Sequence, residues 1–144
     1  MQEILSNLIS NAIKYMLEGG KVLIDVQELP YNKEGYALIQ TKVSDTGIGM
    51  SEEFLPSLFE LFKRERNTTL SKIPGTGLGM AIVKNLVDFM NDSIEVESEL
   101  GKGSTFTITI PHKIAYKDYT NRNIESFDEF DIHFKGKRIL LAEE

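Results

Sequence analysis

Two groups of residues in this chain have the types and spacing needed to bind phosphate together with a divalent metal. The first is a run with glycine at every second position, Gly75-Thr76-Gly77-Leu78-Gly79. The apolar spacing from residue 78 onward predicts an amphipathic helix over residues 78–91. A glycine loop that opens a helix offers backbone N–H groups and a positive helix end to an anion. A plain glycine turn before a packed helix is the alternative, and the motif alone leaves both open.

The second group lies in residues 1–18, which the apolar period predicts to be a helix ended by Gly19-Gly20. Glu3, Asn7, Asn11 and Lys14 are spaced four, four and three residues apart, so they form a polar stripe on one side. Amide oxygens suit a Mg²⁺ ion that already carries phosphate oxygens, and a lysine one turn further along could reach a phosphate. A solvated polar edge is the alternative for such a stripe.

A third motif, Asp45-Thr46-Gly47-Ile48-Gly49-Met50, follows a predicted strand over residues 36–44. An aspartate at a strand end can accept a hydrogen bond from a ligand whose flat face packs on open glycine backbone. A simple turn is the alternative.

The remaining pattern supplies the elements that would position these motifs. Alternating apolar residues predict further strands over residues 21–28, 94–98 and 105–110. In the last of these, Phe106, Ile108 and Ile110 share one face and Thr105 lies on the other. Ser51 is expected to cap a short helix, and the spacing of Phe59 and Phe62 indicates core residues. The polar stretch over about residues 63–74 is expected to be a mobile lid that is poorly ordered without nucleotide.

Composition excludes several classes of protein. The net charge of −6 argues against a general nucleic-acid binder. The lack of cysteine excludes a disulfide framework and a thiolate metal site. No apolar run reaches the roughly 18 residues that span a bilayer, and no signal peptide is visible. We therefore expect a cytoplasmic domain without direct membrane contact, and anchoring through a segment upstream stays open.

Five motifs in order resemble the catalytic, ATP-binding domain of sensor histidine kinases, part of a superfamily with gyrase and DNA-mismatch-repair ATPases. Residues 3–15 resemble the N box, residues 45–50 the G1 box and residues 59–64 the F box. Residues 75–84 resemble the G2 box and residues 101–106 the last glycine box. The resemblance covers residues 2–111. It implies the Bergerat ATP-binding fold, an α/β (α+β) two-layer sandwich whose mixed, mainly antiparallel sheet is covered on one face by helices.

The resemblance also implies a role for each matching position. Asn11 would be the main Mg²⁺ ligand, assisted by Asn7, and Lys14 and Arg64 would reach the phosphates. Tyr15 would lie against the adenine and Asp45 would accept from its amino group. Gly47 and Gly49 would let the base approach, and Thr105 would lie near it. The triphosphate would be wrapped by Gly75, Thr76, Gly77, Leu78 and Gly79.

The implied activity is transfer of the γ-phosphoryl group of Mg-ATP to a histidine on a separate dimerisation domain. Gyrase-like ATPases have a water-activating glutamate at the position that matches residue 7 of this sequence. This chain has an asparagine there, and the missing carboxylate favours phosphoryl transfer over hydrolysis. Two alternatives stay open: a non-catalytic nucleotide-binding module, and a relative of the anti-sigma-type serine kinases.

The same resemblance suggests domain boundaries. We expect the ATP-binding domain over residues 1–111, a linker over residues 112–135, and the start of a receiver-like domain over residues 136–144, as in a hybrid kinase of a two-component phosphorelay. The chain starts almost inside the N box, which leaves open a sheet without the family's first strand. Neither His112 nor His133 lies in an acceptor pattern, so we expect no self-phosphorylation.

Overall fold

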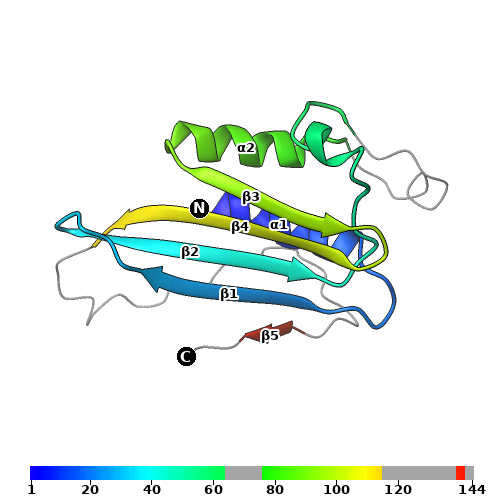
Figure 1. Ribbon diagram of the computed structural model, residues 1–144, viewed down its shortest axis with the longest axis horizontal. Helices are drawn as coiled ribbons and strands as arrows, with labels where there is room; N and C mark the ends of the chain where they lie inside the picture. Colours follow the sequence, from blue (N-terminus) through cyan, green and yellow to red (C-terminus); the bar gives the residue numbers. More distant parts are fainter. Residues whose placement is uncertain (64–75, 115–138, 142–144) are drawn as a thin grey trace, which may run out of the picture.

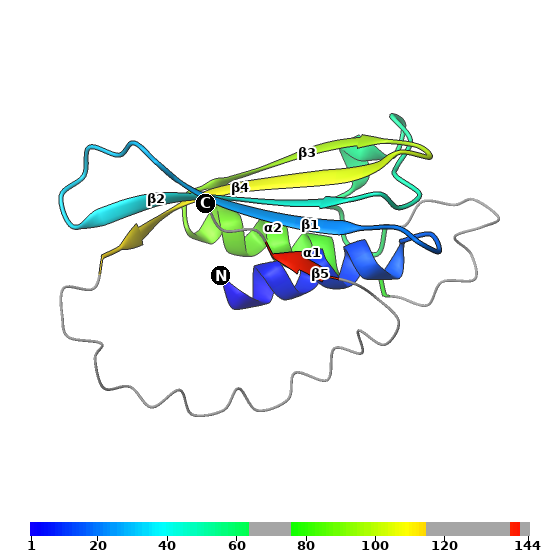
Figure 2. The same ribbon diagram turned by 90° about the horizontal axis from the view of Figure 1, so that it is seen from below.

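Two amphipathic helices lie on one face of an open sheet, as Figures 1 and 2 show. The computed structural model describes residues 1–63, 76–114 and 139–141. Its helices are α1 (Gln2–Lys14), the 3₁₀ helix η1 (Leu55–Ser57) and α2 (Gly79–Phe89). Its strands are β1 (Val22–Leu29), β2 (Tyr36–Asp45), β3 (Ser93–Glu99), β4 (Gly103–Lys113) and β5 (Ile139–Leu141).

The strand order in the sheet is β3-β4-β2-β1-β5. The first four strands pair antiparallel, and β5 pairs parallel to β1. This arrangement confirms the predicted fold class, a two-layer α+β sandwich with a mainly antiparallel sheet.

The core lies between the sheet and the two helices. Val43, Phe106 and Ile108 are buried on the inward face of β2 and β4, against Leu8 of α1 and Val83 of α2. Complete burial of each such side chain contributes about 1.5–3 kcal/mol to the free energy of unfolding. The strand period therefore decides which residues face the helices, and the same period decides which polar residues reach the site described below.

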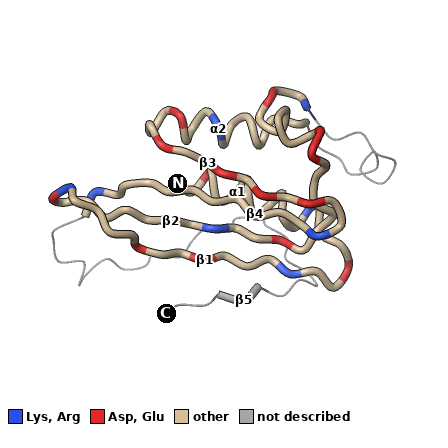
Figure 3. Tube along the Cα trace, in the orientation of Figure 1, with Lys and Arg blue, Asp and Glu red and all other residues tan. Residues whose placement is uncertain are grey.

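Strand β3, at one edge of the sheet, has exposed glutamates at positions 95, 97 and 99, and Figure 3 shows acidic positions in red along this strand. Like charges on an edge strand discourage pairing with a further strand. The other edge of the sheet is formed by β5, which pairs with Val22–Ile24 of β1. Strand β1 exposes the apolar side chains of Leu23 and Val26.

The structure differs from some of the predicted elements and bears on a question that the resemblance left open. The short helix expected after Ser51 is a turn that continues into η1, since Pro56 lacks the N–H needed to extend an α-helix. The resemblance left open a sheet that lacks its first strand, and in the structure β5 pairs with the edge of β1 along Val22–Ile24. Strand β4 also runs to Lys113, past the expected domain end at residue 111. None of the described helices is long and apolar enough to cross a membrane.

Candidate functional site

A pocket of about 270 Å³ opens between α1, the N-terminal end of α2, the loop after β2 and the η1 region. It is lined by Asn7, Ser10, Asn11, Ala12, Lys14, Tyr15, Asp45, Ile48, Gly49, Met50, Phe54, Leu58, Lys63, Thr76, Gly77, Gly79, Met80, Ser104 and Phe106. A pocket of this size with a mixed polar and apolar lining is typical of a small-molecule site.

The floor of the pocket is formed by Asp45 and Ser104, which belong to the last row of inward-facing residues on three neighbouring strands. Asp45 of β2 lies opposite Ser104 of β4, and Ser104 lies opposite Ser98 of β3. The next row along the same strands is Val43, Phe106 and Val96, which is apolar. The polar floor is therefore confined to the end of the sheet where β2 leads into the glycine loop.

Backbone bonds hold that loop on both sides. The Ile48 N–H donates to the carbonyl oxygen of Tyr15 at the end of α1, over 3.1 Å. The Gly101 N–H donates to the Ile48 carbonyl oxygen, over 2.7 Å. Gly47 lies so close to the Tyr15 carbonyl that a Cβ there would be 2.6 Å from its oxygen. The loop therefore has room only for glycine at this position, and its shape is fixed before any ligand arrives.

Asp45 is the acidic residue among the described residues that line the pocket. Burial raises the pKa of Asp45 above its ordinary value, and hydrogen bonds from the backbone N–H groups of Gly47 and Ser104 oppose that rise. The Gly47 N–H lies 2.8 Å from Oδ1. A carboxylate has about four lone-pair sites, so beside the Gly47 and Ser104 N–H groups its second oxygen can still accept a hydrogen bond from an N–H or O–H group in the pocket.

The raised pKa gives a prediction about stability. The folded state binds the Asp45 proton more tightly than the unfolded chain does. It therefore loses stability as the pH rises from the ordinary pKa of 3.8 through the raised pKa. Asp45→Asn removes this titration. The free energy of unfolding of the variant, relative to the wild type, should therefore increase between about pH 3 and pH 7, as measured by urea denaturation. A difference that stays constant across this range would contradict the raised pKa.

The polar stripe of α1 forms one wall. The Nδ2 group of Asn7 donates to the Glu3 carbonyl oxygen over 2.9 Å, and the Nδ2 group of Asn11 lies 3.1 Å from the Met80 sulfur. These contacts occupy the amide nitrogens and leave the amide oxygens as the available ligands. The Nζ atom of Lys14 lies 4.9 Å from the centre of the Tyr15 ring.

The glycine loop and the start of α2 form the facing wall. Gly77 has a φ of +74°, and a Cβ there would lie 2.9 Å from the Lys63 carbonyl oxygen. The Phe62 N–H donates to the Gly77 carbonyl oxygen over 3.1 Å. A Cβ at Gly79 would lie 2.8 Å from Oδ1 of Asn7. Helix α1 and the start of α2 therefore lie close together, and the first turn of α2 borders the pocket.

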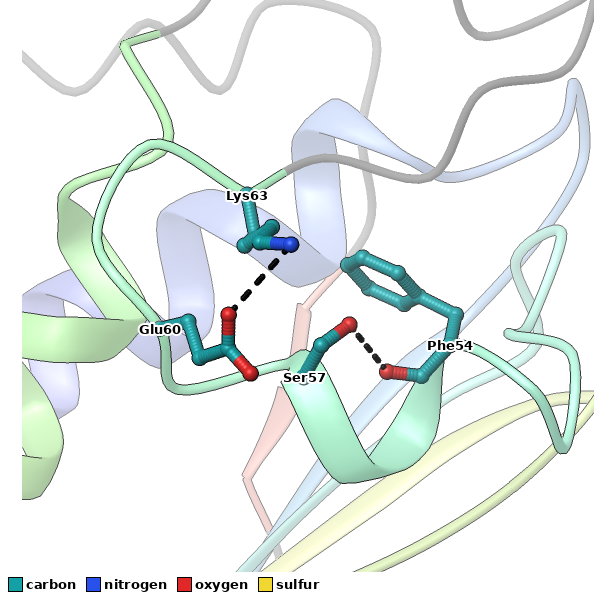
Figure 4. Close-up of polar contacts among 4 residues, drawn as sticks. All are labelled: Phe54, Ser57, Glu60 and Lys63. Atoms are coloured by element: carbon teal, nitrogen blue, oxygen red, sulfur yellow. Dashed lines mark hydrogen bonds and ion pairs between the residues drawn. The ribbon is translucent and has the colours of Figure 1, made fainter.

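The η1 region closes a third side (Figure 4). The Ser57 hydroxyl donates to the Phe54 carbonyl oxygen over 3.0 Å, and the Lys63 ammonium lies 3.4 Å from Oε2 of Glu60. Both residues of this ion pair are more than half exposed, so the pair contributes little to stability. Lys63 can exchange this partner for an anion in the pocket.

Most of the predicted site residues come together in this pocket. Those that line it are Asn7, Asn11, Lys14, Tyr15, Asp45, Gly49, Thr76, Gly77 and Gly79. Gly47 and Leu78 lie in the neighbouring loops without lining it. Arg64, Gly75 and the predicted lid lie outside the described residues, except for Lys63.

Thr105 is not brought to the pocket, contrary to expectation. Its hydroxyl donates to the Ser44 hydroxyl over 3.0 Å on the outward face of the sheet. Successive residues of a strand point to opposite faces, so Ser104 and Phe106 line the pocket instead. The alternation from Phe106 to Ile110 was visible in the sequence and already places Ser104 on the inward face.

Comparisons with known proteins show the family to which the chain belongs. Residues 1–114 match the family model described as "Histidine kinase-, DNA gyrase B-, and HSP90-like ATPase". The chain is 41% identical over its whole length to the autoinducer 2 sensor kinase/phosphatase LuxQ of Vibrio parahaemolyticus, covering 17% of that protein. It is 37% identical to the sensor histidine kinase WalK of Bacillus subtilis, with 81% of this chain and 18% of WalK covered. The chain therefore spans less than a fifth of the length of these relatives.

Solved structures of histidine kinases share the fold of this chain. Full-length ShkA in complex with AMPPNP matches with a TM-score of 0.60 and 33% identity, over 78% of this chain and 21% of ShkA. The mycobacterial sensor histidine kinase MprB matches with a TM-score of 0.60 and 25% identity, over 78% of this chain and 72% of that chain.

Proposed function

Since the chain belongs to the family of histidine kinase-, DNA gyrase B- and HSP90-like ATPases, we propose that it is the part of a sensor histidine kinase that binds Mg-ATP and donates the γ-phosphoryl group. The observation that carries this proposal is the meeting of Asp45, Asn11 and Gly77 around one pocket, from three distant parts of the chain. One end of the pocket suits a base and the other a phosphate chain.

The base lies, in this proposal, at the floor beside Asp45. Its amino group donates to the second carboxylate oxygen, and its flat face packs on the glycine backbone of the loop and on Tyr15. Gly49 has a φ of +64°, and a Cβ there would lie 2.0 Å from the Glu99 carbonyl oxygen. Glycine therefore keeps this loop thin and in place, which supports close approach of the base.

The triphosphate lies between α1 and the glycine loop. The N–H groups of the first turn of α2 and the partial positive charge of its N-terminus suit phosphate oxygens. The described cations that line the pocket are Lys14 and Lys63, and both suit the triphosphate. In this proposal Arg64, Gly75, Thr76 and Leu78 contribute to the same end of the site.

The amide oxygens of Asn7 and Asn11 suit Mg²⁺. Among the described residues no group of three or more His, Cys, Asp or Glu could hold a metal, so a metal here would depend on oxygens of the nucleotide. Mg²⁺ commonly takes one or two protein ligands together with phosphate oxygens and water. Bound there, it would neutralise phosphate charge. Asn11 would be the main ligand and Asn7 its assistant.

Catalysis by this chain would rest on positioning and charge neutralisation. The lysines and backbone N–H groups hold the β- and γ-phosphates. An imidazole nitrogen of the acceptor histidine forms a bond to the γ-phosphorus while the bond to the β–γ bridging oxygen breaks and ADP leaves. Asn7 cannot accept a proton from water as a carboxylate can, which favours the histidine over water as acceptor.

The partners follow from the same proposal. The acceptor histidine lies on a separate dimerisation domain, and a receiver domain accepts the phosphoryl group afterwards. Residues 136–144 begin a receiver-like domain in this proposal, and residues 112–135 link it to the ATP-binding domain. The pairing of residues 139–141 with β1 would then be a contact between the two domains.

The proposal predicts Mg²⁺-dependent binding of a non-hydrolysable ATP analogue in calorimetric titration. We expect a Kd between about 1 μM and 1 mM, tightened about 10-fold by Mg²⁺. Asn11→Ala should lose the tightening by Mg²⁺ because it removes the main amide ligand, while retaining the weaker binding measured without metal.

Asn85→Ala is the matched control, because Asn85 is an exposed residue of α2 that does not line the pocket. This variant should bind as the wild type does. A folded wild-type chain that binds no ATP analogue would refute the proposal. Unchanged Mg²⁺ dependence in Asn11→Ala would refute the role of Asn11.

A further inference from the structure

Ser98 lies at the end of the pocket floor row and makes three polar contacts through one hydroxyl oxygen. The Met50 N–H donates to it over 2.9 Å, the Gly103 carbonyl oxygen lies 3.0 Å away, and the Ser104 hydroxyl oxygen lies 2.9 Å away. Ser98 does not itself line the pocket, whereas Ser104 does. Ser98 thus connects the pocket floor to the glycine loop and to the turn between β3 and β4.

The hydroxyl of Ser98 has one proton and two lone pairs, and its partners decide how they are used. A backbone N–H only donates and a carbonyl oxygen only accepts. The contact with Met50 therefore uses a lone pair, and the contact with Gly103 uses the proton. All three contacts can be hydrogen bonds at once only if Ser104 donates its proton to Ser98.

We propose that Ser98 is a positioning residue that sets the base specificity of the pocket by fixing the direction of the Ser104 hydroxyl. With its proton committed to Ser98, Ser104 presents only lone pairs to a ligand. Ser104 is 8% exposed, so bulk water has little access to reverse this direction. The floor then presents acceptors from both Asp45 and Ser104, which are neighbours across β2 and β4.

A floor of acceptors selects a base edge that donates. The comparison applies to the group at position 6 of the purine, which lies between the two acceptors in this inference. Adenine carries there an amino group with two hydrogens, one for each acceptor, whereas hypoxanthine carries a carbonyl oxygen, which accepts, and its single donor on this edge is the neighbouring N1–H. A carbonyl oxygen that faces two acceptors has no hydrogen-bond donor. Binding a base with its carbonyl oxygen in this state costs binding free energy. Ser98 thereby favours adenine without touching it. This inference rests on the proposed binding of ATP and adds the residue that controls the choice of base.

The test compares affinities for a non-hydrolysable ATP analogue and the matching inosine triphosphate analogue, by displacement of a fluorescent ATP analogue. Four proteins are compared: the wild type, Ser98→Ala, Ser104→Ala and the double variant. In Ser98→Ala the hydroxyl of Ser104 is free to turn and donate to a carbonyl oxygen. We expect the preference for the adenine analogue, expressed as the ratio of the two Kd values, to fall about fivefold.

The double variant separates this role from simple support of the loop. In the Ser104→Ala background, loss of Ser98 should leave the ratio of Kd values unchanged, since no hydroxyl remains to be directed. The inference would be overturned if Ser98→Ala bound both analogues more weakly by the same factor, so that the ratio of Kd values stayed unchanged. Ser98 would then only support Met50. A fall in the ratio that persists in the Ser104→Ala background would also overturn it. Failure of the wild type to bind the ATP analogue would instead refute the proposed function.

Discussion

Replacing Gly103 by alanine is expected to lower the free energy of unfolding by about 3 kcal/mol or more. Gly103 has a φ of +112°, and a Cβ there would lie 1.9 Å from the carbonyl oxygen of Asp45. The obstacle is the backbone of the neighbouring strand, so no side-chain rotation relieves the clash. Strands β2 and β4 would have to separate at the pocket floor, where Asp45 lies opposite Ser104.

Gly101→Ala provides the matched control. Gly101 lies in the same turn with a φ of +82°, but a Cβ there would meet nothing within 4 Å. The control variant should therefore lose only the free energy of unfolding that a left-handed backbone costs an alanine, about 1–2 kcal/mol. Urea denaturation of the two variants measures the difference. Equal losses would show that the backbone contact at Gly103 relaxes without cost.

Asp45→Asn is expected to weaken binding of the ATP analogue about 100-fold, which corresponds to loss of a charge-assisted hydrogen bond. The Gly47 N–H holds one carboxylate oxygen, so the amide oxygen of asparagine takes this place. The NH₂ group then replaces the second oxygen. It donates, as the amino group of adenine does, and the two groups cannot form a hydrogen bond.

Asp25→Asn is the control for this change. Asp25 lies on the outward face of β1, where it accepts a hydrogen bond from Gln27 over 3.0 Å, and it does not line the pocket. Its variant should keep wild-type affinity in the same calorimetric titration. Affinity of Asp45→Asn within about threefold of the wild type would exclude Asp45 as the acceptor for the base.

Local sequence patterns predicted much of the fold and most of the site. The helical period of residues 1–18 and 78–91 places α1 and α2, although α1 ends at Lys14, before the predicted end at residue 18. Strand alternation places β1 to β4 within a few residues. The stripe from Asn7 to Lys14 lines the pocket because the apolar side of the same helix is buried. These predictions succeed since the period of an element fixes which side chains share a face.

The error at Thr105 shows how far a motif can mislead when the period is ignored. Its position in the last glycine box suggested a place in the site, whereas strand alternation from Phe106 brings Ser104 to the pocket. Ser98 was missed for a different reason. Its importance depends on contacts with Met50 and Gly103, and nothing local to residues 94–98 predicts them.

Other differences depend on tertiary contacts. The spacing of Phe59 and Phe62 indicated two core residues, and Phe59 packs against the core. Phe62 is instead 71% exposed and has a φ of +63°. The Phe62 N–H donates to Gly77 in the glycine loop, a contact that fixes the backbone of Phe62 and turns the chain away from the helical spacing.

The parallel pairing of β5 with β1 has a consequence for the order in which the sheet assembles. The pairs β1–β2 and β3–β4 join neighbouring segments of the chain, whereas β1–β5 joins residues from opposite ends of it. Loop-closure entropy opposes such distant contacts until the rest of the structure is formed. With only three residue pairs to offset this cost, β5 is expected to join last during folding and to detach first during partial opening. The hairpins β1–β2 and β3–β4 would thus form first, β2 and β4 would then pair at the centre of the sheet, and β5 would join in the final step.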